Sequence, residues 1–239
     1  MPAIAGGHVS PGPLNSDRLS RVLFIFALVY AGEMIFSLPF HTTRYFRPTF
    51  LDVFSFSNTQ LGDVFAFYGI TAMFSYYFGG PIADRFSPRG LMVFSLAATS
   101  VGGLYLLTIP GFVGTAVVFG WWGVTTIFLF WAAMIRATRE WGGDLSQGLA
   151  FGILDGGRGI VAAAMAVFAV MVFALFMPEN ARLASDVERL AGFRSVIAFY
   201  SAGTLLAAVL VWLIIPPMKP PAYERRPSPL SGMLQVMRR

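Results

Sequence analysis

The sequence of 239 residues contains no cysteine and only two histidines, His8 and His41. The absence of cysteine excludes a disulfide framework, a thiol nucleophile and a thiolate metal site. Neither histidine has neighbours at the spacing of a metal site, so we expect no bound metal and no cofactor. A serine nucleophile would also lack a credible base. These absences argue against an enzyme.

Charge is scarce and apolar residues are abundant. Charged residues make up 12% of the chain and apolar residues 56%, and the mean hydropathy is +0.67. Soluble domains do not have this composition. A helix needs about 20 largely apolar residues to cross the hydrocarbon core, whereas the alternating ten-residue segments of a membrane barrel are missing. The sequence therefore predicts an all-α polytopic membrane protein with six transmembrane helices, over residues 21–41 (or on toward 46), 61–83, 90–109, 112–135, 148–177 and 193–215.

The two ends of the chain differ from this apolar part. The first residues are rich in Gly, Pro and Ser, and the last contain two Pro-Pro pairs and several arginines. Such compositions are typical of disordered tails and linkers. We expect a disordered tail over residues 1–20, a six-helix bundle over 21–215 and a linker or tail over 216–239. The polar segment 178–192 is expected to form a short helix, because Ser185 and Glu188 are spaced as a capping box.

Basic residues are distributed unevenly among the predicted loops. Placing the N-terminus in the cytoplasm puts more arginines there than outside. This distribution favours a topology in which both termini lie in the cytoplasm. The net charge of +5 is thereby explained without a nucleic-acid partner. A basic tail could also contact anionic lipid.

A short charged turn separates the second and third apolar segments. It reads Gly80-x-x-x-Asp84-Arg85-x-x-Pro88-Arg89. This pattern resembles the signature loop of the major facilitator superfamily, although the basic residue that usually ends the pattern is Gly90 here. The chain resembles the N-terminal six-helix half of such a transporter, which is built as a 3+3 inverted repeat. The segment 131–159 is similar to the organophosphate and organic-anion branch.

The resemblance implies a second half. Members of the superfamily usually have twelve helices in two halves, and the solute lies between them. We therefore expect a second six-helix half, in a full-length form of the same chain, on a separate chain or in a homodimer. In the family, the signature loop helps to latch the halves together on the cytoplasmic side, which implies a gating role for Gly80, Asp84, Arg85 and Arg89.

Arg158 is the first candidate for a solute-binding residue. Charge in the middle of a membrane helix is costly and marks a functional site by default. The guanidinium always carries its charge, and its planar fork suits a carboxylate or a phosphate. Asp155 lies three residues earlier on the same helix face. It is either the counter-ion of an anion-binding Arg158 or its partner in a purely structural pair.

The first apolar segment carries further candidates. Glu33 lies near its middle, where a carboxylate that takes up a proton could couple transport to protons, or could simply brace neighbouring helices. His41 and Arg44 are three residues apart. They either join Arg158 in a cavity of positive potential or meet water and headgroups at the outer interface. Aromatic residues that could line such a cavity are Tyr30, Tyr68 and Trp131.

Glycines recur in the fifth segment at helical spacing. Small residues let membrane helices approach closely, so we expect close packing along this face and at Gly102 and Gly103 in the third segment. The members of the face are Gly148, Gly152, Gly156 and Gly159.

Together these features predict half of a secondary transporter that moves a small anionic solute by alternating access. Coupling to protons would use Glu33 or Asp155. Two alternatives remain: a solute-binding or sensory membrane module that does not transport, and a structural half that assembles with a second chain. The expected partners are a solute, the lipid bilayer and the second half, and the expected location is the bacterial inner membrane.

Overall fold

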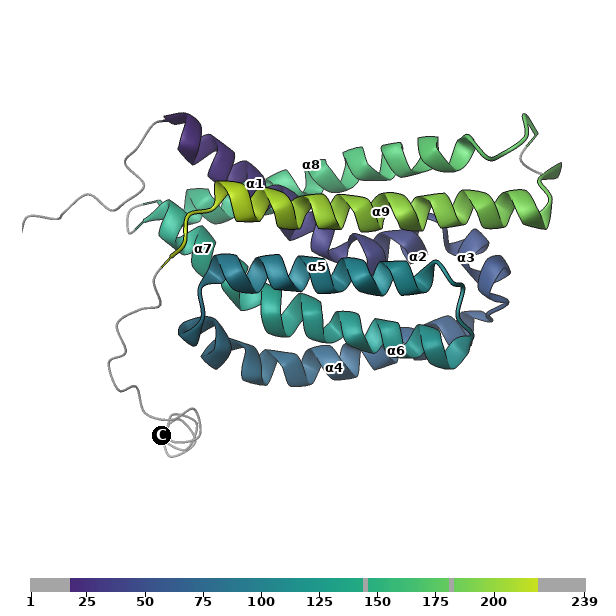
Figure 1. Cartoon of the computed structure of the whole chain (residues 1–239), viewed down its shortest axis with the longest axis horizontal. Coiled ribbons are helices and arrows are strands. Elements are labelled where there is room, and N and C mark those ends of the chain that lie inside the picture. Colours follow the sequence, from purple (N-terminus) through teal and green to yellow (C-terminus); the bar gives the residue numbers. More distant parts are fainter. Residues whose placement is uncertain (1–17, 144–145, 181–182, 219–239) are drawn as a thin grey trace, which may run out of the picture.

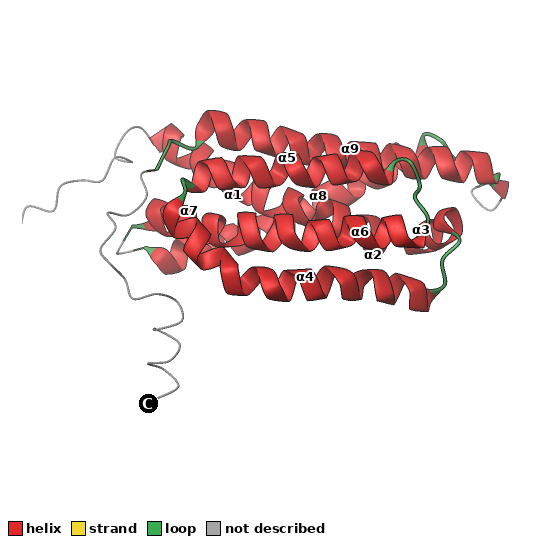
Figure 2. Ribbon diagram, turned by 60° about the horizontal axis from the view of Figure 1, so that its bottom comes forward, coloured by secondary structure: helices red, strands yellow, loops and turns green. Residues whose placement is uncertain are grey.

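The computed structural model of the chain describes residues 18–143, 146–180 and 183–218. Every regular element within these ranges is a helix, as predicted (Figures 1 and 2). Residues 1–17 and 219–239, which make up most of the two expected tails, lie outside the described residues. Residues 18–20, which we assigned to the first tail, already belong to a helix.

The first membrane-crossing rod changes its winding partway along. It consists of α1 (Arg18–Phe36), the π-helical segment η1 (Ser37–His41) and α2 (Thr42–Tyr45). Pro39 has no N–H, and its ring would collide with the carbonyl of the preceding turn, so the wider π turn relieves the conflict. The Met34 carbonyl accepts hydrogen bonds from Ser37 Oγ at 2.7 Å and from Thr204 Oγ1 at 3.0 Å. Hydroxyl groups thus satisfy backbone near the proline, as the apolar surroundings require.

The remaining helices follow one another with short connections. The α6–η2–α7 run forms a second continuous rod, again with a π-helical segment inside it. The elements are α3 (Arg47–Phe54), α4 (Asn58–Arg85), α5 (Pro88–Leu106), α6 (Phe112–Gly123), η2 (Val124–Trp131), α7 (Ala132–Gly142), α8 (Gln147–Ala174) and α9 (Asp186–Ile214).

Five rods in the described part of the chain are long and apolar enough to cross a membrane. They are Arg18–Tyr45, Pro88–Leu106, Phe112–Gly142, Gln147–Ala174 and Asp186–Ile214. The predicted count of six is not confirmed. The predicted span that is not among the five is α4, although its 28 residues give it sufficient length. Its tyrosines, glycines and hydroxyl residues lower its hydropathy below that of the other rods.

Two helix starts show the local signals that set them. Ser185 caps α9 by accepting from the backbone N–H of Glu188, and the Glu188 carboxylate accepts from the backbone N–H of Ser185. The predicted capping box is confirmed, and it begins α9 itself. Part of the short helix that we expected over 178–192 falls on residues 181–182, which lie outside the described residues, and Leu183 beside them has 3₁₀ geometry, with its N–H 2.9 Å from the Asn180 carbonyl. Ser57 and Gln60 form the same reciprocal pair at the start of α4, a signal that the sequence analysis missed.

The rods lie side by side along one direction (Figure 1). The start of α1, the turn between α4 and α5 and the end of α9 share one end of the bundle, and the turn between α5 and α6 lies at the other. Helix α5 packs mainly on α9, α4 on α6 and η2, and α1 on both α8 and α9. The chain between these helices therefore passes back and forth through one bundle.

Small and hydroxyl residues bring α5 close to its neighbours. Thr99 Oγ1 donates to Thr125 Oγ1 at 2.7 Å, and Ser100 Oγ donates to the Ser201 carbonyl at 2.9 Å. A Cβ at Gly103 would overlap the Ser201 hydroxyl and Leu38, so the expected close approach at this glycine is confirmed. Such contacts replace the hydrophobic effect as the cause of helix association in lipid.

The glycine face of α8 behaves differently from our prediction. A Cβ at Gly148, Gly152, Gly156 or Gly159 would meet no atom within 4 Å, and only 6% of the most apolar stretch of α8 is buried. Close packing on this face is therefore wrong for the described chain. The contact with α1 uses Gly157 instead, where a Cβ would lie 2.8 Å from a Val29 methyl group. The face remains open on the outside of the bundle.

Candidate functional site

A cavity of about 670 Å³ lies between the first rod, α4, η2 and α8. It is lined by five of the six residues that we expected to bind the solute, namely His41, Arg44, Tyr68, Trp131 and Arg158. Glu33, one of the two expected proton-coupling residues, also lines it. The rest of its lining is Phe36, Phe40, Thr43, Arg47, Leu61, Phe65, Ala72, Tyr76 and Ile127. The predicted residues come from four separate segments, so the fold brings them together.

Glu33 lies at the centre of the charged side chains. Its Oε1 is 3.0 Å from Nε2 of His41, and its Oε2 is 3.3 Å from Nε of Arg158. The side chains of Glu33 and His41 are 10% and 6% exposed, so this carboxylate is withdrawn from solvent. His41 is thus not at an outer interface, which was the alternative left open above. A buried carboxylate with two basic partners is compensated in charge and fixed in orientation.

Arg158 has more than one partner. Its guanidinium lies 5.5 Å from the Phe36 ring centre and 5.8 Å from the Trp131 ring centre, within the range of cation–π attraction. Its NH1 is also 3.6 Å from Asp155, whose side chain is 71% exposed and does not line the cavity. The pairing of Arg158 with Asp155 expected from their spacing is therefore present. The inner counter-ion is Glu33, which the sequence analysis did not pair with Arg158.

A glycine in α1 makes room for the contact between Glu33 of α1 and Arg158 of α8. Gly32 precedes Glu33, and a Cβ at this position would lie 3.2 Å from Cδ of Arg158. The missing side chain leaves the space in which the arginine stem lies. Both π-helical segments end at the cavity, η1 with His41 and η2 with Trp131. Wide turns of this kind are frequent at functional sites because they redirect side chains.

Two further arginines extend the cavity toward α3. Arg44 is exposed and lies 5.8 Å from the ring centre of its neighbour Tyr45. Arg47 donates to Oδ1 of Asn58 from Nε at 3.2 Å and from NH2 at 2.8 Å. Within the described residues, neither arginine forms an ion pair with a carboxylate. Arg47 was not among our candidates, since it was assigned to an outer loop.

The predicted aromatic residues divide into two groups. Tyr68 and Trp131 line the cavity, and the Tyr68 hydroxyl is 2.9 Å from Oγ1 of Thr126. Tyr30 does not line it. Its ring stacks on Phe26, and its hydroxyl donates to the Gly203 carbonyl at 3.4 Å, so it joins α1 to α9. The expectation that Tyr30 faces the cavity is therefore wrong.

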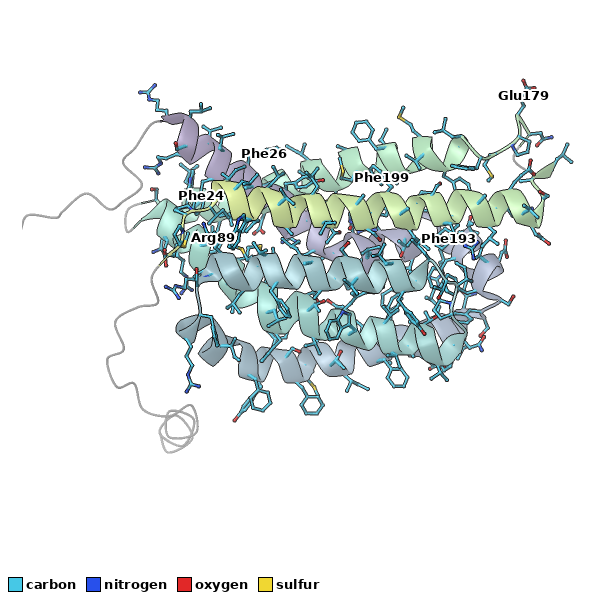
Figure 3. The ribbon with its side chains drawn as sticks, viewed as in Figure 1. Phe24, Phe26, Arg89, Glu179, Phe193 and Phe199 are labelled. Carbon is cyan, nitrogen blue, oxygen red and sulfur yellow. The ribbon has the colours of Figure 1, made fainter. Side chains whose placement is uncertain are left out.

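The residues of the predicted gating motif lie at the other end of α4 and at the start of α5. The turn between Arg85, the last residue of α4, and Pro88, the first of α5, is two residues long. Gly80 is exposed within α4, and the Asp84 side chain is outside what the structure describes. Arg89 donates to the Ile215 carbonyl at 3.4 Å and lies 4.4 Å from the Trp212 ring centre, near the end of α9 (Figure 3). Arg89 thus holds the ends of α5 and α9 together.

Comparison with known proteins identifies the family of this chain. The family model of the Major Facilitator Superfamily matches residues 14–239. The inner membrane protein YqcE of Escherichia coli is 28% identical over 201 residues, which are 84% of this chain and 44% of that protein. The inner membrane protein YihN of the same organism is 28% identical over 188 residues, which are 79% of this chain and 42% of that protein. None of the solved structures matches the chain.

The chain thus spans less than half the length of these two relatives. The family match, by contrast, covers nearly all of it and agrees with the apolar helical bundle. The chain therefore belongs to the major facilitator superfamily, a family of membrane transporters.

Proposed function

We propose that this chain is one half of a secondary transporter for a small anionic solute, which binds in the cavity beside Arg158. The observation that carries the proposal is the charge of the cavity lining. The lining contains three arginines, at positions 44, 47 and 158, and one carboxylate, that of Glu33. A cavity with excess positive charge attracts and holds anions.

Each lining residue has a distinct role in this proposal. Arg158 binds the anion through its guanidinium, which Phe36 and Trp131 hold in place. Arg44 and Arg47 raise the potential near α3 and draw the anion inward. His41 fixes the orientation of Glu33, and Tyr68 and Trp131 shape the wall.

Glu33 is the proposed proton-coupling residue, with Asp155 as a second candidate. Protonation of Glu33 would remove the negative charge next to Arg158 and leave the guanidinium available to the solute. Nδ1 of His41 is buried and has no hydrogen-bond partner among the described residues. The other ring nitrogen, Nε2, lies 3.0 Å from Oε1 of Glu33, so this is the atom through which the imidazole would exchange a proton with the carboxylate. Solute binding and proton binding would thus involve the same three side chains.

A second six-helix half completes the proposed transporter. The relatives are more than twice as long as the matched segment, and the outward face of α8 presents four glycines that no described residue of this chain covers. We assign α4 as the sixth span because its length suffices and it lies along the same bundle. The end of the bundle with Arg85 and Arg89 would face the cytoplasm of a bacterial inner membrane, where the signature loop would act as a gate.

Transport by the assembled protein tests the proposal. The chain is reconstituted into liposomes with its second half, and uptake of radiolabelled organic anions is measured against organic cations. We expect Arg158-dependent uptake of an anion and none of cations. Binding of an anion without uptake would instead indicate a solute-binding module that does not transport. Uptake that is unchanged in Arg158→Ala would contradict the proposed site.

A further inference from the structure

We infer that the anion carries a flat, apolar ring, so that the solute is an aromatic carboxylate or a similar ring-bearing organic acid. This inference rests on the proposed anion site at Arg158. Its basis is that the cavity has two chemically different walls. One is cationic, and the other is built from aromatic rings.

The aromatic wall follows one stripe of α4. The residues Leu61, Phe65, Tyr68, Ala72 and Tyr76 are spaced four, three, four and four apart, and all of them line the cavity. Such spacing places side chains on one helix face. The stripe contains no charged side chain, and three of its five members carry a ring.

Rings from the first rod continue this wall. The Phe40 ring centre lies 5.8 Å from that of Phe65, in a stacked arrangement, and 5.1 Å from that of Tyr68, edge to face. Phe36 lies 6.0 Å from Trp131, also edge to face. These distances are those of favourable aromatic pairs. The rings therefore form one connected surface from α4 to η2.

The cationic wall consists of the three arginines of the lining, which come from other segments than the α4 stripe. Arg44 and Arg47 lie on α2 and α3, and Arg158 comes from α8. The aromatic surface and the cationic wall meet at Arg158, whose guanidinium lies 5.5 Å from the Phe36 ring centre and 5.8 Å from the Trp131 ring centre. An acid group bound there would have aromatic faces directly beside it.

The size of the cavity favours an organic solute over a small anion such as sulfate or acetate. Sites for drug-sized organic ligands have volumes of about 300–1,000 Å³ and are mainly apolar with a few polar groups that fix orientation. The cavity has about 670 Å³ and the same division of residues. A sulfate or acetate ion at Arg158 would leave the aromatic wall uncovered. A ring-bearing acid would use both walls.

Calorimetric titration of the purified chain in lipid nanodiscs tests this inference, with sodium benzoate, sodium acetate and sodium glucuronate as probes. Benzoate is expected to bind at least about tenfold more tightly than acetate, because only benzoate buries a ring against the aromatic wall. Glucuronate, whose ring is polar, is expected to bind no more tightly than acetate. Arg158→Ala should abolish the binding of all three.

Substitutions on α4 provide matched variants. Phe65→Leu and Tyr76→Leu should lower the ratio of benzoate to acetate affinity about three- to tenfold while leaving acetate binding unchanged. Tyr76 is 59% exposed, so its substitution should not disturb folding. Phe74→Leu and Tyr77→Leu are the controls, because these side chains lie on the same helix and do not line the cavity. The controls should keep the wild-type ratio.

The outcomes separate this inference from the proposed function. Equal affinities for benzoate and acetate, both lost in Arg158→Ala, would overturn the ring preference and leave the anion site standing. Glucuronate binding as tight as benzoate binding would overturn the apolar character of the ring. Failure of all three probes to bind the wild type would overturn the anion site itself.

Discussion

Glu33 and Arg158 meet across the cavity, with Oε2 of the glutamate 3.3 Å from Nε of the arginine, and so connect α1 to α8. The carboxylate occupies the position in which the acid group of a solute would satisfy Arg158. Glu33 is thus an internal competitor for the proposed anion. The ion pair links α1 to α8, and the proposed solute must displace it or find it neutralised.

Glu33→Gln should therefore strengthen anion binding. The amide keeps the size of the side chain but removes the negative charge beside Arg158, so we expect benzoate affinity to rise about three- to tenfold. In the absence of the anion, the variant should unfold at a lower temperature, because Arg158 loses a buried counter-ion. Calorimetry and thermal unfolding with and without benzoate measure both effects. Weaker binding in Glu33→Gln would show that the carboxylate supports the solute rather than competing with it.

The same substitution should change how transport depends on pH. If Glu33 takes up the coupling proton, uptake by the two-half transporter should increase at acidic pH, and Glu33→Gln should remove this dependence. Asp155→Asn is the matched control, since Asp155 also contacts Arg158 but is exposed outside the cavity lining. It should retain the wild-type profile. A profile lost in Asp155→Asn and kept in Glu33→Gln would move proton coupling to Asp155.

Adjacent glycines on α8 should respond oppositely to alanine. At Gly157 a Cβ would lie 2.8 Å from a Val29 methyl group, so Gly157→Ala should destabilise the contact of α8 with α1 by about 1–3 kcal/mol. At Gly156 a Cβ would meet nothing within 4 Å, so Gly156→Ala should be neutral or stabilise the chain by up to ~1 kcal/mol. Unfolding of the purified chain in detergent compares the two. Equal effects would show that the α1–α8 contact is not as close as described.

The open glycine face should matter only when the second half is present. The double substitution Gly152→Leu with Gly156→Leu should leave the chain alone folded, because a Cβ at either site would have no atom of the described residues within 4 Å. It should weaken association with a second six-helix half, since bulky side chains prevent a close helix approach. Light-scattering mass of the co-purified halves reports the association. An unchanged two-half mass would place the contact on another helix.

The helices were largely predictable because hydropathy reports burial in lipid directly. The ends of the helices were less predictable, because a helix can continue beyond the apolar part of its sequence. Helix α7 runs to Gly142, through Arg136 and Glu140, which form an ion pair of 3.0 Å, whereas the prediction stopped at residue 135. The start of α9 at Asp186 lies before its apolar stretch for the same reason.

The site was predictable where charge at membrane depth singled residues out. Glu33, His41 and Arg158 were found in this way, and they lie together. The pairing of Glu33 with Arg158 was not predictable, because it depends on the packing of α1 against α8, whereas Asp155 was recognised from its spacing along one helix. The aromatic stripe of α4 was not recognised in the sequence, because 15% of all residues are aromatic and its members did not stand out.

The central claim is that Arg158 binds an anion, and titration of the purified chain with benzoate tests it most directly. The wild type should bind benzoate, Arg158→Ala should bind at least about a hundredfold more weakly, and Arg158→Lys should recover little of the loss, because an ammonium cannot reproduce the planar fork. A folded Arg158→Ala variant that binds benzoate as the wild type does would contradict the account.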